Sequence, residues 1–251
     1  MGPDRGWQCR EAPVSSGPDA PRFLAVLPAR GGSKRIPRKN IRMFHGKPLI
    51  ARTIQTVLTS GVFQDVIVST DDIEIADVAR KHGASVPFMR PASLSDDHTP
   101  TAPVIRHAID ELATSHEPYD AICCVYPGAV LLTPSNFSAS SLLVHQAIIH
   151  NAVVAAVVKY GHPIQRALRQ QREGYLVPVD QEAMLQRTQD LQQTWHDAGQ
   201  FYWATPNRWR NPAPLLSQVI PYELPTWRAQ DIDTEEDWTR AELIARLNTS
   251  I

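Results

Sequence analysis

Short apolar runs alternate with amphipathic segments along most of the chain. Uninterrupted apolar runs are typical of strands buried on both faces, and they predict strands at 23–28, 65–70, 84–88, 120–126 and 152–158. Apolar positions three or four residues apart predict helices at 48–60, 71–81, 101–113, 134–150 and 234–247. This alternation predicts a doubly wound α/β fold with a mainly parallel sheet.

Residues 160–215 interrupt this alternation, because they are rich in Gln, Pro and Trp. We expect a small excursion of short strands and loops at about 130–215, within a single domain at 23–251. Residues 1–22 are rich in Pro and Gly and contain no apolar segment typical of a secretion signal, so we expect a disordered N-terminal tail.

The composition is that of an ordinary globular protein, with 251 residues, of which 43% are hydrophobic and 20% charged. Three cysteines are too few for a disulfide scaffold, and Cys123 and Cys124 lie inside an apolar run. Reduced core cysteines favour a cytoplasmic location. The longest uncharged stretch, 121–158, contains prolines and histidines that interrupt it, so no membrane span is expected.

The charges are unevenly distributed. The net charge is −1, which gives no overall field for binding nucleic acid or a membrane surface. Residues 20–64, however, carry nine basic side chains and no acidic one. A basic segment in a nearly neutral protein indicates a compact anionic ligand, such as a nucleoside triphosphate.

The basic segment centres on LPARGGSKRIPRKN at 27–40, directly after the first expected strand. A glycine pair permits close approach of the backbone to a phosphate, and arginine and lysine bind phosphate oxygens. The stretch is neither a Walker A motif nor GxGxxG. A solvated basic loop is the alternative, but open α/β sheets bind ligands at such strand ends. A phosphate site is therefore favoured.

Asp231-Ile232-Asp233 carries two carboxylates two residues apart, which face the same way in an extended segment. Mg²⁺ commonly binds one or two carboxylates together with phosphates and waters. Acidic residues at a helix start are equally compatible with this spacing, so both interpretations stay open. Asp71 and Asp72 also follow a strand, and capping of the next helix is the favoured interpretation there.

The basic loop, ARGGSKRIPRKN, resembles the signature of CMP-sugar-acid synthetases, the cytidylyltransferases that activate nonulosonic acids. Three further phrases agree: VSTDD at 68–72, RPASLSDDHT at 90–99 and AQDIDTEEDW at 229–238. HDAGQFYW at 196–203 and HPIQRAL at 162–168 are similar to the pseudaminic acid branch. The resemblance covers residues 23–247.

The resemblance implies CTP and a nonulosonic acid as substrates, Mg²⁺ as cofactor, and a homodimer. Its nucleotide-binding residues would be Ala29, Arg30, Gly31, Ser33, Lys39, Asn40, Arg90, Thr99 and Thr101. Asp231 and Asp233 would bind the metal, and Gln165, Arg166 and Gln200 the sugar. Arg30, Lys39 and Asp233 would serve catalysis.

One stretch departs from this branch. The pseudaminic acid enzymes usually read Tyr-Ala-Thr-Ala-Pro after the fourth strand, whereas this chain reads YPGAVLL at 126–132. Pseudaminic acid is the favoured acceptor, and N-acetylneuraminic acid, legionaminic acid or Kdo remain alternatives. A non-catalytic nucleotide-binding homologue also remains open. A glycosyltransferase that uses a nucleotide sugar is disfavoured, because a diphosphate needs fewer cations than the basic loop supplies.

Overall fold

The computed structural model describes residues 20–114 and 116–248, so the expected N-terminal tail lies outside the described residues except for its last three. The strands are β1 (Phe23–Pro28), β2 (Met43–Phe44), β3 (Lys47–Pro48), β4 (Asp65–Ser69), β5 (Ala121–Val125), β6 (Val153–Lys159), β7 (Leu168–Gln170), β8 (Leu176–Pro178), β9 (Trp195–Ala204) and β10 (Val219–Glu223). The helices are α1 (Leu49–Thr59), α2 (Ile73–Lys81), α3 (Thr101–Leu112), α4 (Pro134–Ser141), α5 (Val144–His150), α6 (Gln181–Leu185), α7 (Pro206–Arg210) and α8 (Glu235–Asn248). Within the described ranges, no helix has both the length and the apolar character needed to cross a bilayer.

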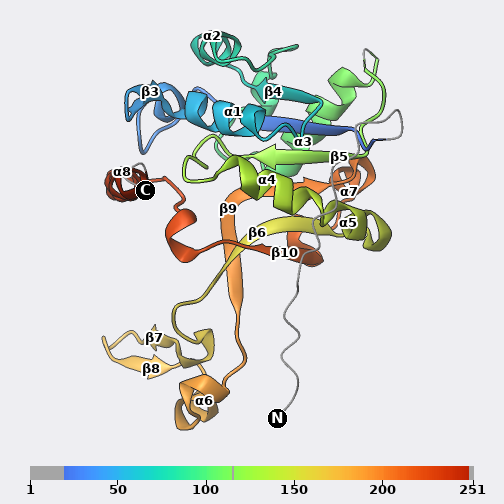
Figure 1. Ribbon diagram of the computed structural model, residues 1–251. Helices are drawn as coiled ribbons and strands as arrows, with labels where there is room; N and C mark the ends of the chain where they lie inside the picture. Colours follow the sequence, from blue (N-terminus) through green and yellow to red (C-terminus); the bar gives the residue numbers. More distant parts are fainter. Residues whose placement is uncertain (1–19, 115, 249–251) are drawn as a thin grey trace.

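Six strands form the central sheet, in the order β10-β6-β9-β5-β1-β4 (Figure 1). β1 pairs in parallel with β4 and β5, and β6 pairs in parallel with β10. β9 lies between β5 and β6 and runs antiparallel to both. The sheet is therefore mostly parallel, as the sequence predicts.

Helices cover both faces of the sheet, and alternate residues of each strand pack against opposite layers. In β1, Ala25 and Leu27 face the layer that contains α1, α2, α4 and α5. Leu24 and Val26 face the layer of α3 and α7. Burial on both faces explains why the strands read as continuous apolar runs. Cys123 and Cys124 are free, fully buried thiols on opposite faces of β5.

Two expected elements differ from the structure. Instead of the strand expected at 84–88, the structure has isolated bridges from Ser85 to Ile67 and, one residue beyond that range, from Met89 to Thr70. Pro87 removes a ladder donor there, which explains the missing strand. The single helix expected at 134–150 is two helices, α4 and α5. Serine hydroxyls at the end of α4 donate to its own carbonyls, as Ser141 Oγ does to Ser138 O at 2.8 Å, and such bonds compete with helix continuation.

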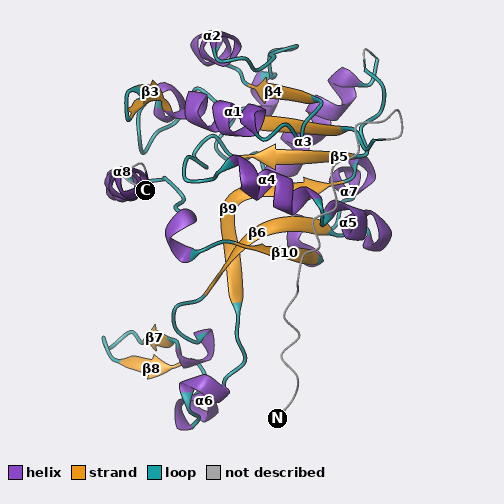
Figure 2. Cartoon of the chain, in the orientation of Figure 1, coloured by secondary structure: helices purple, strands orange, loops and turns teal. Residues whose placement is uncertain are grey.

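The excursion is smaller than expected, because β6 and β9 both belong to the central sheet. Only residues 160–194 leave the main body, and they form a lobe that contains the β7–β8 hairpin and α6 (Figure 2). Neither β9 nor the edge strand β10 was expected from the sequence.

A third apolar cluster lies outside the sheet and holds loops together. Ile36 of the basic loop and Ile232 of the acidic segment are both buried in it. Leu131 and Trp238 of α8 complete the contact between these segments. The cluster brings the basic loop and the acidic segment to the same place.

Candidate nucleotide-binding site

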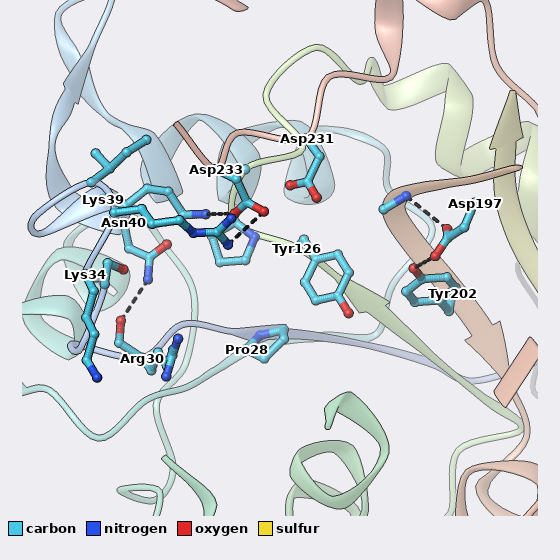
Figure 3. Close-up of a pocket in the computed structure, with 16 residues that line it drawn as sticks. Pro28, Arg30, Lys34, Lys39, Asn40, Tyr126, Asp197, Tyr202, Asp231 and Asp233 are labelled. Carbon is cyan, nitrogen blue, oxygen red and sulfur yellow. Dashed lines mark hydrogen bonds and ion pairs between the residues drawn. The ribbon is translucent and has the colours of Figure 1, made fainter. Parts of the chain in front are cut away.

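A cavity of about 410 Å³ opens where the parallel strands β1 and β5 end (Figure 3). This is the edge at which open α/β sheets bind ligands. Four segments far apart in the sequence form it: the basic loop, the residues after β5, part of β9, and the acidic segment. Its lining residues are Pro28, Arg30, Ser33, Lys34, Arg35, Ile36, Lys39, Asn40, Tyr126, Pro127, Gly128, Asp197, Gly199, Tyr202, Asp231 and Asp233.

Hydrogen bonds and a buried anchor shape the basic loop. Asn40 is buried, and its Nδ2 donates to the carbonyl of Arg30 at 3.0 Å, which closes the loop. Ile36 is 1% exposed and fixes the loop to the third cluster. Arg38 has a φ of 55°, so the chain turns through the left-handed region before Lys39. These constraints hold Arg30 and Lys39 on the wall of the cavity.

Gly31 is required by the crowding around Asp72. A Cβ built on Gly31 would lie 2.5 Å from Asp72 Oδ2. Asp72 caps α2 by accepting a hydrogen bond from Ile75 N at 3.0 Å, so the cap predicted from the sequence is confirmed. Asp71 accepts the N–H of Gly31 at 3.0 Å, a role the sequence did not indicate. Neither Gly31 nor Ala29 lines the cavity.

The cations of the cavity already have partners. Asp97 pairs with both Lys34 and Arg30, and their hydrogen bonds hold its pKa below the usual value. Arg35 Nη2 lies 2.8 Å from Asp233 Oδ2. Lys39 Nζ donates to the carbonyl of Ile232 at 2.6 Å and lies 3.4 Å from Asp233 Oδ1. An anionic ligand would therefore compete with carboxylates for these four cations.

Asp231 and Asp233 both line the cavity, and Ile232 between them is fully buried. This is the alternation expected of an extended segment. Burial, and then the charge of Asp233, raise the pKa of Asp231. Asp237 accepts hydrogen bonds from Thr234 N and Oγ1, and Thr234 Oγ1 accepts from Asp237 N, so α8 has its own reciprocal cap. The cap therefore does not use the carboxylates of Asp231 and Asp233, which line the cavity.

These two carboxylates suit a divalent cation that also binds substrate oxygens. Within residues 20–114 and 116–248, no group of three or more His, Cys, Asp or Glu side chains gathers as a metal cage. Mg²⁺ does not require one, because it usually keeps waters and binds one or two carboxylates together with phosphates. The negative charge of Asp233 contributes to the raised pKa of Asp231. A cation bound between the two carboxylates would reduce this repulsion.

The residues expected around the base and ribose lie beside the cavity rather than on its wall. Arg90 is 6% exposed, and its Nη2 lies 3.8 Å from Asp71 Oδ1. Nε and Nη2 of Arg90 have no hydrogen-bond partner among the described residues, and burial lowers its pKa. Thr99 Oγ1 donates to Asp96 at 2.7 Å. Thr101 Oγ1 contacts Oη of the lining residue Tyr126 at 2.5 Å.

At the other end of the cavity, Tyr126 and Tyr202 were not assigned from the sequence, whereas Asp197 was one of several polar residues considered for sugar recognition. Figure 3 shows Asp197 and Tyr202 together, across Tyr126 from the basic loop. Tyr202 Oη donates to Asp197 Oδ2 at 2.5 Å. The rings of Tyr126 and Tyr202 meet edge to face, with centroids 5.8 Å apart. The available signal for Asp197 and Tyr202 was the phrase HDAGQFYW at 196–203, which contains both residues.

The residues expected to bind the sugar do not line the cavity. Gln165 and Arg166 lie in a 3₁₀ turn of the lobe, Ile164–Arg166, and Gln165 Nε2 donates to Gln192 O at 2.9 Å. Gln200 is 1% exposed. Its Nε2 donates to the carbonyls of Ala198, Gly199 and Gln230, so it supports the backbone of β9 beside the cavity.

Comparisons with known proteins agree with this geometry. The family model described as Cytidylyltransferase matches residues 24–202. The pseudaminic acid cytidylyltransferase of Campylobacter jejuni subsp. jejuni serotype O:2 is 38% identical over 228 residues, covering 90% of this chain and 97% of that protein. The CMP-N,N'-diacetyllegionaminic acid synthase of Legionella pneumophila subsp. pneumophila is 34% identical, with coverage of 90% and 97%.

A solved structure, CMP:2-keto-3-deoxy-manno-octonic acid synthetase complexed with CTP, superimposes with a TM-score of 0.62 at 15% identity. The superposition covers 92% of this chain and 100% of the synthetase chain. At this identity the likeness shows the fold alone. None of the three proteins named here is a glycosyltransferase.

Proposed function

Because the chain belongs to the cytidylyltransferase family, we propose that it transfers the cytidylyl group of CTP to a nonulosonic acid, and that pseudaminic acid is its acceptor. One observation carries this proposal: a single cavity holds a cationic loop at one side and the carboxylates of Asp231 and Asp233 beside it. The relative matched over 97% of its length supports pseudaminic acid in particular.

In the proposed reaction, the anomeric hydroxyl oxygen of the sugar acid attacks the α-phosphorus of CTP. A phosphorus–oxygen bond forms to the sugar, the bond to the β-phosphate oxygen breaks, and the electron pair leaves with diphosphate. The hydroxyl proton passes to solvent. Arg30, Ser33, Lys39 and Asn40 hold the triphosphate, and the charges of Arg30 and Lys39 stabilise the leaving diphosphate.

Arg90, Thr99 and Thr101 are proposed to bind the base and ribose beside this site. The unpartnered N–H groups of buried Arg90 support this role, because a buried donor without an acceptor is costly. A carbonyl oxygen of cytosine is a suitable acceptor for them. Ala29 and Gly31 contribute through the backbone that positions Arg30.

Asp231 and Asp233 are proposed to hold Mg²⁺, whose charge, when bound, neutralises the phosphate oxygens. Asp233 also places Arg35 and Lys39, since both cations contact its carboxylate. When Lys39 binds a phosphate instead of Asp233, the Asp233 carboxylate would be able to bind the metal.

A homodimer formed through the lobe is also proposed. Tyr175, Leu176, Val179 and Leu185 of the lobe are 60–90% exposed, and exposed apolar clusters mark interaction surfaces. A dimer would also explain how Gln165 and Arg166, which do not line the cavity of their own copy, bind the sugar. They contact an acceptor only if the lobe of one copy reaches the cavity of another. Gln200 is proposed to serve the sugar site from its own copy, by shaping β9. Buried, free Cys123 and Cys124 support a cytoplasmic location.

The test of this function is a competition between acceptors. The protein, CTP and Mg²⁺ are incubated with an equimolar mixture of pseudaminic, legionaminic, N-acetylneuraminic and Kdo acids, and products are separated by mass. CMP-pseudaminic acid is expected to form fastest. Preferential formation of another CMP-sugar would contradict the proposed acceptor, and absence of every CMP-sugar would contradict the proposed reaction.

A further inference from the structure

A bulge in β9 places an acidic side chain at the end of the cavity opposite the basic loop. Between the pairs Ala155–Tyr202 and Val157–Asp197, the register advances two residues along β6 but five along β9. Gly199 lies inside this bulge with a φ of 60°, a conformation that favours glycine. Bulges redirect side chains and occur next to active sites. Here the bulge places both Asp197 and Tyr202 on the cavity wall.

Hydrogen bonds fix the orientation of the Asp197 carboxylate. Oδ1 accepts the N–H of Gly199 at 2.9 Å, and Oδ2 accepts Tyr202 Oη at 2.5 Å. Tyr202 is 4% exposed, and burial raises its pKa, so it remains a donor at neutral pH. The carboxylate therefore keeps unused lone pairs toward the cavity in a fixed direction.

The charge around Asp197 argues against contact with the nucleotide phosphates. Among the described residues, no Lys, Arg or His lies within ion-pair distance of it, in contrast to Asp97 and Asp233. A phosphate beside this carboxylate would be repelled. Arg30, Lys34 and Lys39 lie on the other side of Tyr126, as Figure 3 shows.

A sugar acid offers groups that suit this end. Its carboxylate adjoins the reacting anomeric carbon and stays near the cations, while its hydroxyl and acylamino groups, which donate hydrogen bonds, extend away. We propose that Asp197 binds these donor groups of the acceptor and is a specificity-determining residue, with Tyr202 as its positioning residue. This inference rests on the proposed function.

Steady-state kinetics of Asp197→Asn test the proposal, because this variant keeps the shape and the bond from Gly199 while removing the negative acceptor. The KM for the sugar acid should rise about 10- to 100-fold, since hydrogen bonds to charged groups are the strong ones. The KM for CTP and the shift in melting temperature caused by CTP should stay unchanged. Tyr202→Phe should raise the sugar KM less, because the carboxylate remains.

Asp77→Asn is the matched control, since Asp77 lies on α2, where its exposed carboxylate pairs with Arg80. An unchanged sugar KM in Asp197→Asn, or a rise confined to the KM for CTP, would overturn the assignment of Asp197. Failure of the proposed function is seen separately, in the unmodified protein. If that protein forms no CMP-sugar with any acid, the function is refuted and this inference with it.

Discussion

The fit of Gly31 against Asp72 gives a prediction that separates two adjacent glycines. Gly31→Ala places a Cβ 2.5 Å from Asp72 Oδ2 and 3.0 Å from Asp72 Cβ, so that side chain must move. Moving it breaks the cap of α2 and the ion pair with Arg38. A Cβ added to Gly32 would have no atom within 4 Å, and the φ of Gly32 lies outside the left-handed region. Gly32→Ala is therefore the matched control.

The lost cap and the overpacking together predict a destabilisation of about 1–3 kcal/mol for Gly31→Ala. For a chain of this size, that lowers the melting temperature by about 2–12 °C. Gly32→Ala should leave it unchanged or raise it slightly, because alanine restricts the unfolded chain. Thermal unfolding of both variants, followed by circular dichroism, measures the difference. Equal melting temperatures in the two variants would refute the reasoning from the contact with Asp72.

Four further predictions concern the site and the core. Arg30→Ala and Lys39→Ala should each lower kcat/KM for CTP roughly 10- to 150-fold, which corresponds to a loss of about 1.5–3 kcal/mol of transition-state stabilisation. Substitution of the exposed Lys47 by Ala should leave kcat/KM unchanged, and equal kinetics in all three variants would contradict the phosphate role. In the presence of Mg²⁺, CTP should raise the melting temperature more than ATP, GTP or UTP, and equal shifts would mean that the base is not read. Asp231→Asn should lower turnover by several orders of magnitude. The pKa of Asp231 is higher in the folded state than its ordinary value of 3.8. The unmodified protein therefore loses stability as the pH rises from 3.8 through the raised pKa. Asp231→Asn lacks this loss, so its metal-free melting temperature should equal or exceed that of the unmodified protein at pH 7, and a lower value would contradict the raised pKa. A Cys9→Ser variant should react with a thiol reagent only on unfolding, because Cys123 and Cys124 are fully buried and burial raises both thiol pKa values; labelling of the native variant would contradict their burial.

The sequence predicts the parts of the fold whose hydrophobic pattern is local. β1, β4, β5 and β6 are buried on both faces, and each reads as an apolar run. β9 was missed because it begins exposed and contains a bulge, so no regular period marks it. Residues 84–88 have the composition of a strand, but Pro87 prevents the ladder. The resemblance to CMP-sugar-acid synthetases was confirmed by the family match.

The basic loop and the acidic segment were predicted because each carries its chemistry in a few consecutive residues. Their meeting depends on Ile36 and Ile232, which are buried in one cluster although they lie far apart in the sequence. No local pattern reports such a contact. The same reason hides the pair of Asp97 with Arg30. The bond between Tyr202 and Asp197 joins residues five apart in one strand, and it depends on the bulge in β9. The position of Asp197 and Tyr202 on the cavity wall depends on the bulge in β9, which the sequence did not predict.

The central claim, transfer of the cytidylyl group within this cavity, is tested most directly by ³¹P NMR of the protein with CTP, Mg²⁺ and pseudaminic acid. We expect the three CTP resonances to be replaced by one phosphodiester resonance of the CMP-sugar and by that of diphosphate, in equal molar amounts. Omitting the sugar acid should leave CTP intact. Formation of CDP and phosphate, or persistence of CTP in the complete mixture, would contradict this claim.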